Sequence, residues 1–488
     1  MASRGGVKIY PFVLANIKHF LAKLVQIPDV QCAWLLLLYC AASRCNHTLR
    51  TLPPDLSQDY AERHDIAMRR TLSEILGRSD INQTNEILCA LCTMKHSHGG
   101  LGLRSARRTA PAAYWASIAD TIPEIQKRYP RFGQRIVQWL NSSDSIPHSM
   151  TEAAEARRHL INSGYHRCPG WQDIAAGIRP PPIHDVEPGE WAHGWQFHAA
   201  THIEYHYRNR ILYSMSPSQR AMVRSQSGRG SGAHLSITPT CPELCIENEH
   251  MNVILLRRLR LPLPLTSRFC NGRRCRRELD SLGDHRAACP KSGRLKRRSI
   301  PMENMIARIC REGGARVRTN VLVRDLNIGN VDIEDGRRIE VIAEGLPLYN
   351  GRQIAIDATL ISTLTREGRP HHHSDDTDGA ALNEARRKKE RHYSDIVTSQ
   401  RCHLLVAGIE TGGRWEIEFS NFVQHLARNK SRNSIPILAR SMQAILYRRW
   451  QGLVAVASHK AFAKSLLDED FGDCPCEGGS LPQWSELV

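Results

Sequence analysis

The chain has 488 residues, a formal net charge of +17 and a pI of about 9.4. This length predicts two to four domains. The positive charge favours a polyanionic partner, nucleic acid ahead of an anionic membrane, with a generally basic surface as the alternative. The longest apolar run, residues 33–42, is half of the ~20 residues that a membrane span needs, so no span is expected. The absence of a secretory pattern and 15 scattered cysteines favour a reducing intracellular compartment over a disulfide-stapled secreted protein.

The first half of the chain has mainly helical patterns. Apolar residues at helical spacing predict helices over 9–140, including a single helix over 31–50. The next segment contains Trp171, Trp191 and Trp195 among prolines, and its Gly228–Gly232 stretch predicts a flexible link. The sequence therefore divides into a helical region (1–140), an irregular or helical connector (141–250), an apolar-basic segment with a Cys/His cluster (251–299), an α/β domain (300–467) and a loose acidic tail (468–488).

Four side chains in the third segment have the types and spacing of zinc ligands. Cys270, Cys275, His285 and Cys289 follow the pattern C-x4-C-x9-H-x3-C. Three thiolates and one imidazole suit tetrahedral Zn²⁺, and four protein ligands leave no open position. The sequence therefore predicts a structural zinc site.

Many cations surround this cluster, and we expect them to contact nucleic-acid phosphates. They are Arg273, Arg274, Arg276, Arg277 and Arg286 within the cluster, and Lys296, Arg297 and Arg298 after it. A nuclear-import signal is the competing use of the second basic run. Either use favours the nucleus, with the cytoplasm as the alternative location.

The fourth segment alternates helices and strands. The patterns predict a helix over 301–312, strands over 317–323, 337–342 and 354–362, a helix over 380–397, a strand over 403–409, and helices over 416–428 and 437–466. An Asn350-Gly351 pair between two strands is a strong hairpin signal. This α-β-β-β-α-β order resembles the core of the PD-(D/E)XK nuclease fold.

Two acids interrupt the apolar strands of this hairpin, Glu340 and Asp357. A carboxylate among apolar neighbours costs several kcal/mol unless it is compensated. In the fold that the order resembles, one acid from each arm of the hairpin converges on a divalent metal, and carboxylate oxygens suit Mg²⁺. Glu344 competes with Glu340, because an ideal two-residue turn would place Glu344 opposite Asp357. Gly345-Leu346-Pro347 should interrupt regular pairing, however, so Glu340 in the apolar strand is preferred. Glu303, on the preceding helix, is expected to face solvent, with a role as an accessory acid as the alternative.

The nuclease chemistry also needs a cation near the attacking water. Thr359 stands where the family usually has lysine, two residues after the second acid. On the following helix, Lys389 shares one face with Ala381 and Ala385, and Lys388 lies one step off that face. We therefore expect Lys389 to fill the role, with Lys388 as the second choice.

Residues 251–466 resemble the C-terminal region of non-LTR retrotransposon proteins, in which a Cys/Cys/His/Cys zinc knuckle precedes a restriction-like endonuclease. The stretches LGDHRAAC, RRIEVIAEGLP, GRQIAIDATLIS and ARRKKERHY carry the resemblance. The upstream stretches LLYCAASRCNHTLRTLPPD and HGGLGLRSARRTAPAAYWASIAD resemble the thumb-like helical region that follows the polymerase palm.

The resemblance implies a function and leaves one alternative. It implies a Mg²⁺-dependent DNA endonuclease with Glu340 and Asp357 as metal ligands, Lys389 as the catalytic cation, and DNA or RNA as partner. The first acid departs from the family pattern, because no Pro-Asp precedes it. No apolar strand ending in paired aspartates is present, so we expect no polymerase activity without a separate reverse transcriptase. The alternative is an inactive remnant that binds nucleic acid through its zinc module.

Overall fold

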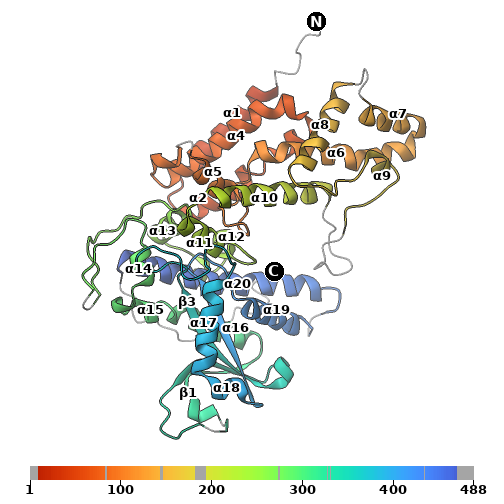
Figure 1. The fold of residues 1–488 in the computed structure, drawn as a ribbon. Coiled ribbons are helices and arrows are strands. Elements are labelled where there is room, and N and C mark those ends of the chain that lie inside the picture. Colours follow the sequence, from red (N-terminus) through yellow and green to blue (C-terminus); the bar gives the residue numbers. More distant parts are fainter. Residues whose placement is uncertain are drawn as a thin grey trace. The chain divides into compact units, whose positions relative to one another are not determined.

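The computed structural model describes residues 9–82, 85–142, 147–181, 194–272, 275–326, 328–329, 331–432 and 435–469. The chain divides into two compact units, Met1–Ser216 and Pro217–Val488 (Figure 1). The division falls inside residues 141–250, so the expected connector contributes helices to both units. No helix in the described part of the chain is both long enough and apolar enough to cross a membrane.

The first unit is helical throughout its described residues. Its α-helices are α1 (Ile9–Leu24), α2 (Val30–Leu36), α3 (Asn46–Thr51), α4 (Pro54–Ile75), α5 (Glu86–Thr93), α6 (Ala106–Arg128), α7 (Pro130–Asn141), α8 (His148–Asn162), α9 (Trp171–Ala175) and α10 (Trp195–Ser214). The prediction of one helix over 31–50 is wrong, because α2 passes into a short π-helix, Leu37–Ala41, and α3 starts anew. Ser43 Oγ donates to the Tyr39 carbonyl at this break, and such a local hydroxyl bond competes with regular helix bonding.

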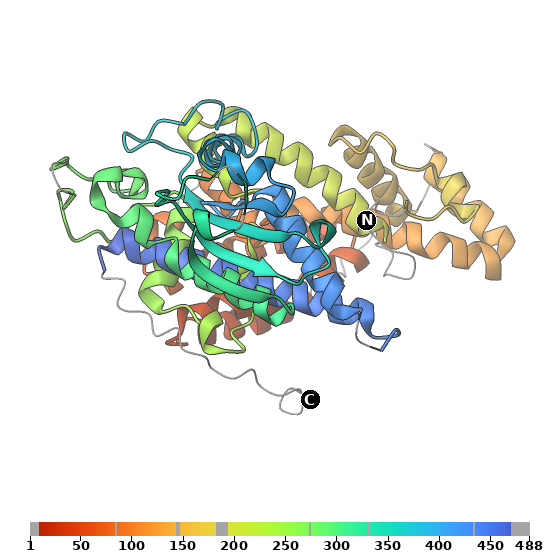
Figure 2. The same ribbon diagram turned by 90° about the horizontal axis from the view of Figure 1, so that it is seen from below.

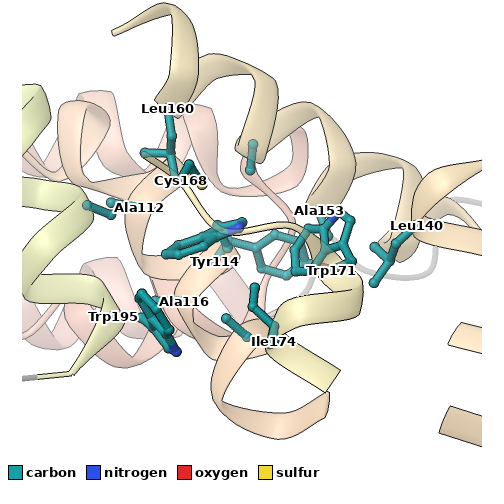
Figure 3. Close-up of a cluster of buried hydrophobic side chains, with 14 of the residues drawn as sticks. Ala112, Tyr114, Ala116, Leu140, Ala153, Leu160, Cys168, Trp171, Ile174 and Trp195 are labelled. Atoms are coloured by element: carbon teal, nitrogen blue, oxygen red, sulfur yellow. The ribbon is translucent and has the colours of Figure 1, made fainter. Parts of the chain in front are cut away.

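Aromatic side chains form the core around α6. Trp115 of α6 contacts Trp195 edge to face at a centroid separation of 5.8 Å, and it lies 6.4 Å from Trp171 and 6.0 Å from Tyr165. Figure 3 shows Trp171 and Trp195 converging on this core from their two helices. These tryptophans therefore hold α9 and α10 on α6 within the first unit, while Trp191 lies outside the described residues.

The second unit combines helices with one sheet. Its α-helices are α11 (Pro217–Ser225), α12 (Ala233–Ser236), α13 (Asn248–Arg258), α14 (Asp284–Ala288), α15 (Arg294–Arg297), α16 (Ile300–Glu312), α17 (Ala380–His392), α18 (Ser394–Thr398), α19 (Ile417–Ser431) and α20 (Ala439–Leu467). Its strands are β1 (Arg316–Leu322), β2 (Arg338–Glu344), β3 (Gln353–Ile361) and β4 (Cys402–Glu410). The chain therefore contains the predicted mixture of an all-helical part and an α/β part.

The sheet has the strand order β1-β2-β3-β4, and it is mixed. β1, β2 and β3 pair antiparallel, whereas β3 and β4 pair parallel through the α17 crossover. α16 packs on β1 and β2, and α17 packs on β3 and β4 (Figure 2). The predicted strands and helices of this segment are confirmed to within a few residues, except that the helix over 380–397 is divided at Tyr393 into α17 and α18.

The glycine-rich stretch Gly228–Gly232 is packed, so the prediction of a flexible link is wrong. Ser231 is fully buried, and its carbonyl accepts a hydrogen bond from Arg258. Gly230 has a φ of +77°, and a Cβ there would lie 2.3 Å from the Gln451 side chain of α20. The positive φ, together with the nearby Gln451 side chain, therefore favours glycine here for a packed conformation and not for flexibility.

Candidate active site and metal cluster

The β2–β3 register sets the position of the two acids. Val341 lies across from Ile356, and Ala343 lies across from Ile354. Continuing this register by one step places Glu340 opposite Asp357. Side chains directly opposite in an antiparallel pair lie on the same face of the sheet. The two carboxylates therefore come from adjacent strands to one face.

Glu344, the competing first acid, is engaged elsewhere. A short helical turn at Tyr349–Gly351 replaces the ideal two-residue turn and shifts the register away from the Glu344–Asp357 pairing. The Glu344 carboxylate instead accepts from Arg318 at 2.7 Å and from Gln353 at 2.8 Å. Glu344 is thus tied to β1 and to the start of β3.

α17 supplies the cation beside these acids, and it runs alongside β3 (Figure 1). Lys389 Nζ donates to Asp357 Oδ1 at 2.7 Å, and the Asp357 side chain is 0% exposed. Ala381 and Ala385 are buried on the same helix face, which brings the helix close to the sheet. Lys388 is exposed and lies 3.4 Å from Glu384, so it points away from Asp357. Of the two lysines, only Lys389 contacts the buried acid.

The site is strongly acidic around this one lysine. Burial, followed by the charge of Asp357, raises the pKa of Glu340 to about 8. Its Oε2 atom is buried and has no hydrogen-bond partner among the described residues. The expectation that Glu303 faces solvent is wrong, because Glu303 is partly buried and accepts from Ser299 at 2.7 Å. Burial and the charge of Asp357 also raise the pKa of Glu303. Three acids thus share one neighbourhood with Lys389.

These residues fit a Mg²⁺ ion in their donor chemistry. Glu340 offers an orphaned carboxylate oxygen next to Asp357. Mg²⁺ retains several waters and is commonly held by one or two carboxylates. In this structure both oxygens of Asp357 are hydrogen-bonded, to Lys389 and to Thr359, and Glu303, Glu340 and Asp357 are not among the close groups of metal-ligand side chains in the described part of the chain. Thr359 Oγ1 donates to Asp357 Oδ2 at 3.2 Å, so Thr359 helps to orient this carboxylate.

The four predicted zinc ligands come together. Their ligand atoms all lie within 4.8 Å of one another. The sulfur of Cys289 lies 3.9 Å from that of Cys270 and 3.7 Å from that of Cys275, and the Cys275 sulfur lies 3.4 Å from His285 Nε2. Tetrahedral zinc with Zn–S of ~2.3 Å and Zn–N of ~2.0 Å requires separations of about 3.8 Å and about 3.5 Å. The three printed separations are close to these values, so the cluster could bind a zinc ion.

A residue that the sequence reasoning missed positions the histidine of this cluster. Asp280 accepts from the backbone N–H groups of Asp284 and His285 at 2.9 and 2.7 Å. It thus holds the first turn of α14, which carries His285. An acid a few residues before a short helix was the available signal, since acidic side chains often satisfy the first N–H groups of helices. Burial lowers the pKa of His285, which favours the neutral imidazole that a metal requires.

The basic residues around the cluster have different environments. Arg276, Arg277, Lys296 and Arg297 are exposed, although Arg277 forms an ion pair with Glu367 at 2.7 Å. Arg273 and Arg274 lie outside the described residues.

Two of the predicted phosphate-binding arginines are buried, and that prediction is wrong for them. Arg286 is 6% exposed and donates to the Leu466 carbonyl. Arg298 is 2% exposed and donates to the carbonyls of Ala287 and Leu360. A buried guanidinium that is bound to backbone carbonyls cannot reach a phosphate on the surface.

A second cluster of ligand types lies in the first unit. Asp55, His148 and Glu152 place ligand atoms within 4.8 Å of one another. The His148 Nε2 atom lies 3.1 Å from Asp55 Oδ2, and the Glu152 carboxylate accepts from the backbone of Asp55. These contacts between α4 and α8 account for the arrangement without a metal.

A scan against protein-family models gives no match, and no curated protein matches the chain. The geometry of the two clusters in the second unit therefore carries the functional argument.

Proposed function

We propose that the second unit is a Mg²⁺-dependent endonuclease of the restriction-like PD-(D/E)XK type. One observation carries this proposal: the register sets Glu340 opposite Asp357 while Lys389 reaches the same buried carboxylate at 2.7 Å. The element order from α16 to β4 supports it, because that order matches the core of this nuclease fold.

Each residue has a distinct role in this proposal. Glu340 and Asp357 hold the metal, and Thr359 fixes the orientation of Asp357. The metal, when bound, supplies Lewis-acid stabilisation of the scissile phosphate and lowers the pKa of a bound water. Lys389 moves its ammonium group from Asp357 toward the phosphate, where it stabilises the developing negative charge.

The substrate is a nucleic-acid backbone, and DNA is favoured by the resemblance described above. Lys296 and Arg297 on α15 are exposed, and the charge of Lys296 acts on Glu303 next to the acids. Cations near a phosphodiester-cleaving site increase affinity by releasing counterions from the substrate. The surface beside the acids is therefore suited to a polyphosphate chain.

The experiment compares nicking of supercoiled plasmid by the full chain and by Asp357→Asn in the presence of Mg²⁺. We expect nicking by the wild type and a loss of at least about 10²-fold in the variant, because the substitution removes a negative ligand at constant shape. Glu344→Gln is the matched control, since Glu344 lies on the same hairpin and points to β1. Equal nicking by wild type and Asp357→Asn overturns the proposal.

A second function is supported by the Cys/His cluster, in which several ligand separations are close to those of a tetrahedral metal site. In this alternative the chain is a catalytically inactive remnant of a retrotransposon protein that binds nucleic acid through the zinc module. It predicts salt-sensitive binding that zinc removal abolishes and no Mg²⁺-dependent cleavage. The absence of nicking together with zinc-dependent binding would favour this alternative.

A further inference from the structure

Arg298 carries a positive charge into the interior of the second unit. It follows α15 directly and is 2% exposed. Its Nη1 donates to the Ala287 carbonyl at 2.7 Å, and its Nη2 donates to the Leu360 carbonyl at 2.8 Å. Its guanidinium also lies 5.7 Å from the centroid of the Phe462 ring. Its hydrogen-bond acceptors are therefore two backbone carbonyls.

Each of the two carbonyls lies close in sequence to one of the two clusters of candidate functional residues. Ala287 lies on α14, between the predicted zinc ligands His285 and Cys289. Leu360 lies on β3, three residues after Asp357. One side chain thus connects the Cys/His cluster with the strand that carries the buried acid.

Near Leu360, β3 pairs with β4 on one edge, and its pairing with β2 on the other edge has ended. β2 pairs with β3 over Ile354–Ile356, whereas the pairing of β3 with β4 continues to Ile361. Arg298 therefore binds β3 beyond Ile356, the last residue of β3 that pairs with β2. The loss of this bond would leave β4 as the neighbouring strand there.

Burial makes the two hydrogen bonds depend on each other. A buried charged donor that loses an acceptor retains its desolvation penalty, so the loss of one bond favours withdrawal of the whole side chain. Burial lowers the pKa of Arg298 to about 10, so the group remains charged at neutral pH. If the Ala287 carbonyl moves, the bond to Leu360 becomes unfavourable as well.

Metal binding by the cluster would add constraints on both sides of Ala287. α14 spans five residues, and a helix this short is not stable by its own hydrogen bonds. His285 and Cys289 fix both sides of Ala287 when they bind one metal. Without a metal, Asp280 holds the first turn, Asp284 pairs with Arg257 and Arg260, and Arg286 donates to the Leu466 carbonyl. The constraint that only a bound metal would add is the one at Cys289, on the other side of Ala287.

We propose that Arg298 is a positioning residue that couples zinc occupancy of the Cys/His cluster to the order of β3. Zinc fixes α14, α14 presents the Ala287 carbonyl, and Arg298 then holds the Leu360 carbonyl and the strand behind Asp357. The consequence for catalysis rests on the proposed nuclease function, whereas the coupling itself does not.

The experiment measures hydrogen–deuterium exchange of the full chain without DNA and without Mg²⁺. Exchange is followed at the amides of 359–361 in β3, with β1 as internal reference, before and after zinc removal. The variants are Arg298→Met, Arg298→Lys and the matched control Arg297→Met, whose parent side chain is exposed one position earlier.

We expect zinc removal to accelerate exchange at 359–361 about ten-fold relative to β1 in the wild type and in Arg297→Met. In Arg298→Met the exchange is already fast with zinc bound, and zinc removal changes it by less than about two-fold. Arg298→Lys keeps the charge but reaches a single carbonyl, and it should restore only part of the protection. A residue that contributed only to global stability would change β1 and β3 alike.

Two results overturn the coupling. One is an equal acceleration by zinc removal in the wild type and in Arg298→Met. The other is unchanged β3 exchange in the zinc-free wild type, and this measurement decides the matter even if Arg298→Met fails to fold. Because no cleavage is measured, equal nicking by wild type and Asp357→Asn would refute the nuclease without affecting this result.

Discussion

Replacing Lys389 by methionine tests the ion pair at the centre of the candidate active site. Asp357 is 0% exposed, and its remaining side-chain partners in the variant include the Thr359 hydroxyl at 3.2 Å and Tyr393. Removing one partner of a fully buried ion pair costs about 3–5 kcal/mol. Because the lysine side chain is 32% exposed, solvent screening lowers this figure, and we expect about 2–3 kcal/mol.

The assay is equilibrium unfolding in urea, with and without Mg²⁺. A loss of about 2–3 kcal/mol lowers the midpoint by about 1 M for an m-value of about 2–3 kcal/mol/M. Mg²⁺ should increase the free energy of unfolding more in Lys389→Met than in the wild type, because in the variant no lysine competes with the ion for the Asp357 carboxylate. A ligand at about ten times its Kd contributes about 1.4 kcal/mol.

Lys388→Met is the matched control, since its parent side chain is exposed and lies 3.4 Å from Glu384 on the helix surface. Such a surface change should remain within about 0.5 kcal/mol of the wild type. If Lys389→Met loses no more stability than Lys388→Met, the ion pair does not compensate Asp357 and the reasoning fails.

Three further predictions concern other charged groups of the second unit. Burial raises the pKa of Glu410 to about 7, above its unfolded value of about 4.5, so about 3 kcal/mol of stability present below pH 4.5 should be lost as the pH rises through about 7. Urea unfolding at about pH 5 and about pH 8 measures this slope, and Glu410→Gln should flatten it. Cys289→Ser should lower the zinc content of the purified chain, measured by elemental analysis. A stoichiometry of one zinc per chain in this variant would contradict the assignment of Cys289 as a zinc ligand. A Lys296→Ala, Arg297→Ala double variant should reduce the salt slope of duplex binding by about 1.8, measured by fluorescence anisotropy, and an unchanged slope would place the DNA elsewhere.

Local patterns in the sequence were sufficient to predict the strands and the spacing of the zinc ligands. Apolar runs and turn residues marked β2 and β3, and the alanine face of α17 identified Lys389 over Lys388. These features depend on near neighbours in the chain. The register was harder, because the Asn350-Gly351 turn favoured Glu344. The Gly345–Pro347 interruption and the turn at Tyr349–Gly351 moved Glu340 into place instead.

Long-range contacts explain what the sequence did not predict. Arg298 and Lys296 stand in one basic run, yet Arg298 finds two carbonyls that are distant in sequence, and Lys296 remains exposed. Gly230 belongs to a stretch typical of linkers, but Gln451 of α20 packs against it. Composition cannot distinguish these cases, because the deciding partner lies far along the chain.

Buried charges in the second unit separate structural groups from candidate catalytic ones. The buried cations have partners: Arg257 pairs with Asp284 at 2.6 Å, and Arg298 binds two carbonyls. Among the acids, Glu410 lies 4.0 Å from Arg414 inside the protein, where a raised pKa lets it become neutral. Burial also disfavours the charged form of Glu340, but this residue lies opposite a second carboxylate, Asp357, that is paired with Lys389. Two acids placed together raise each other's electrostatic cost, and in this structure the raised pKa of Glu340 and the Lys389–Asp357 ion pair offset it. The neighbouring second acid and its lysine, and not burial alone, distinguish the Glu340–Asp357 pair from Glu410, and the proposed metal would be a further way to compensate both charges.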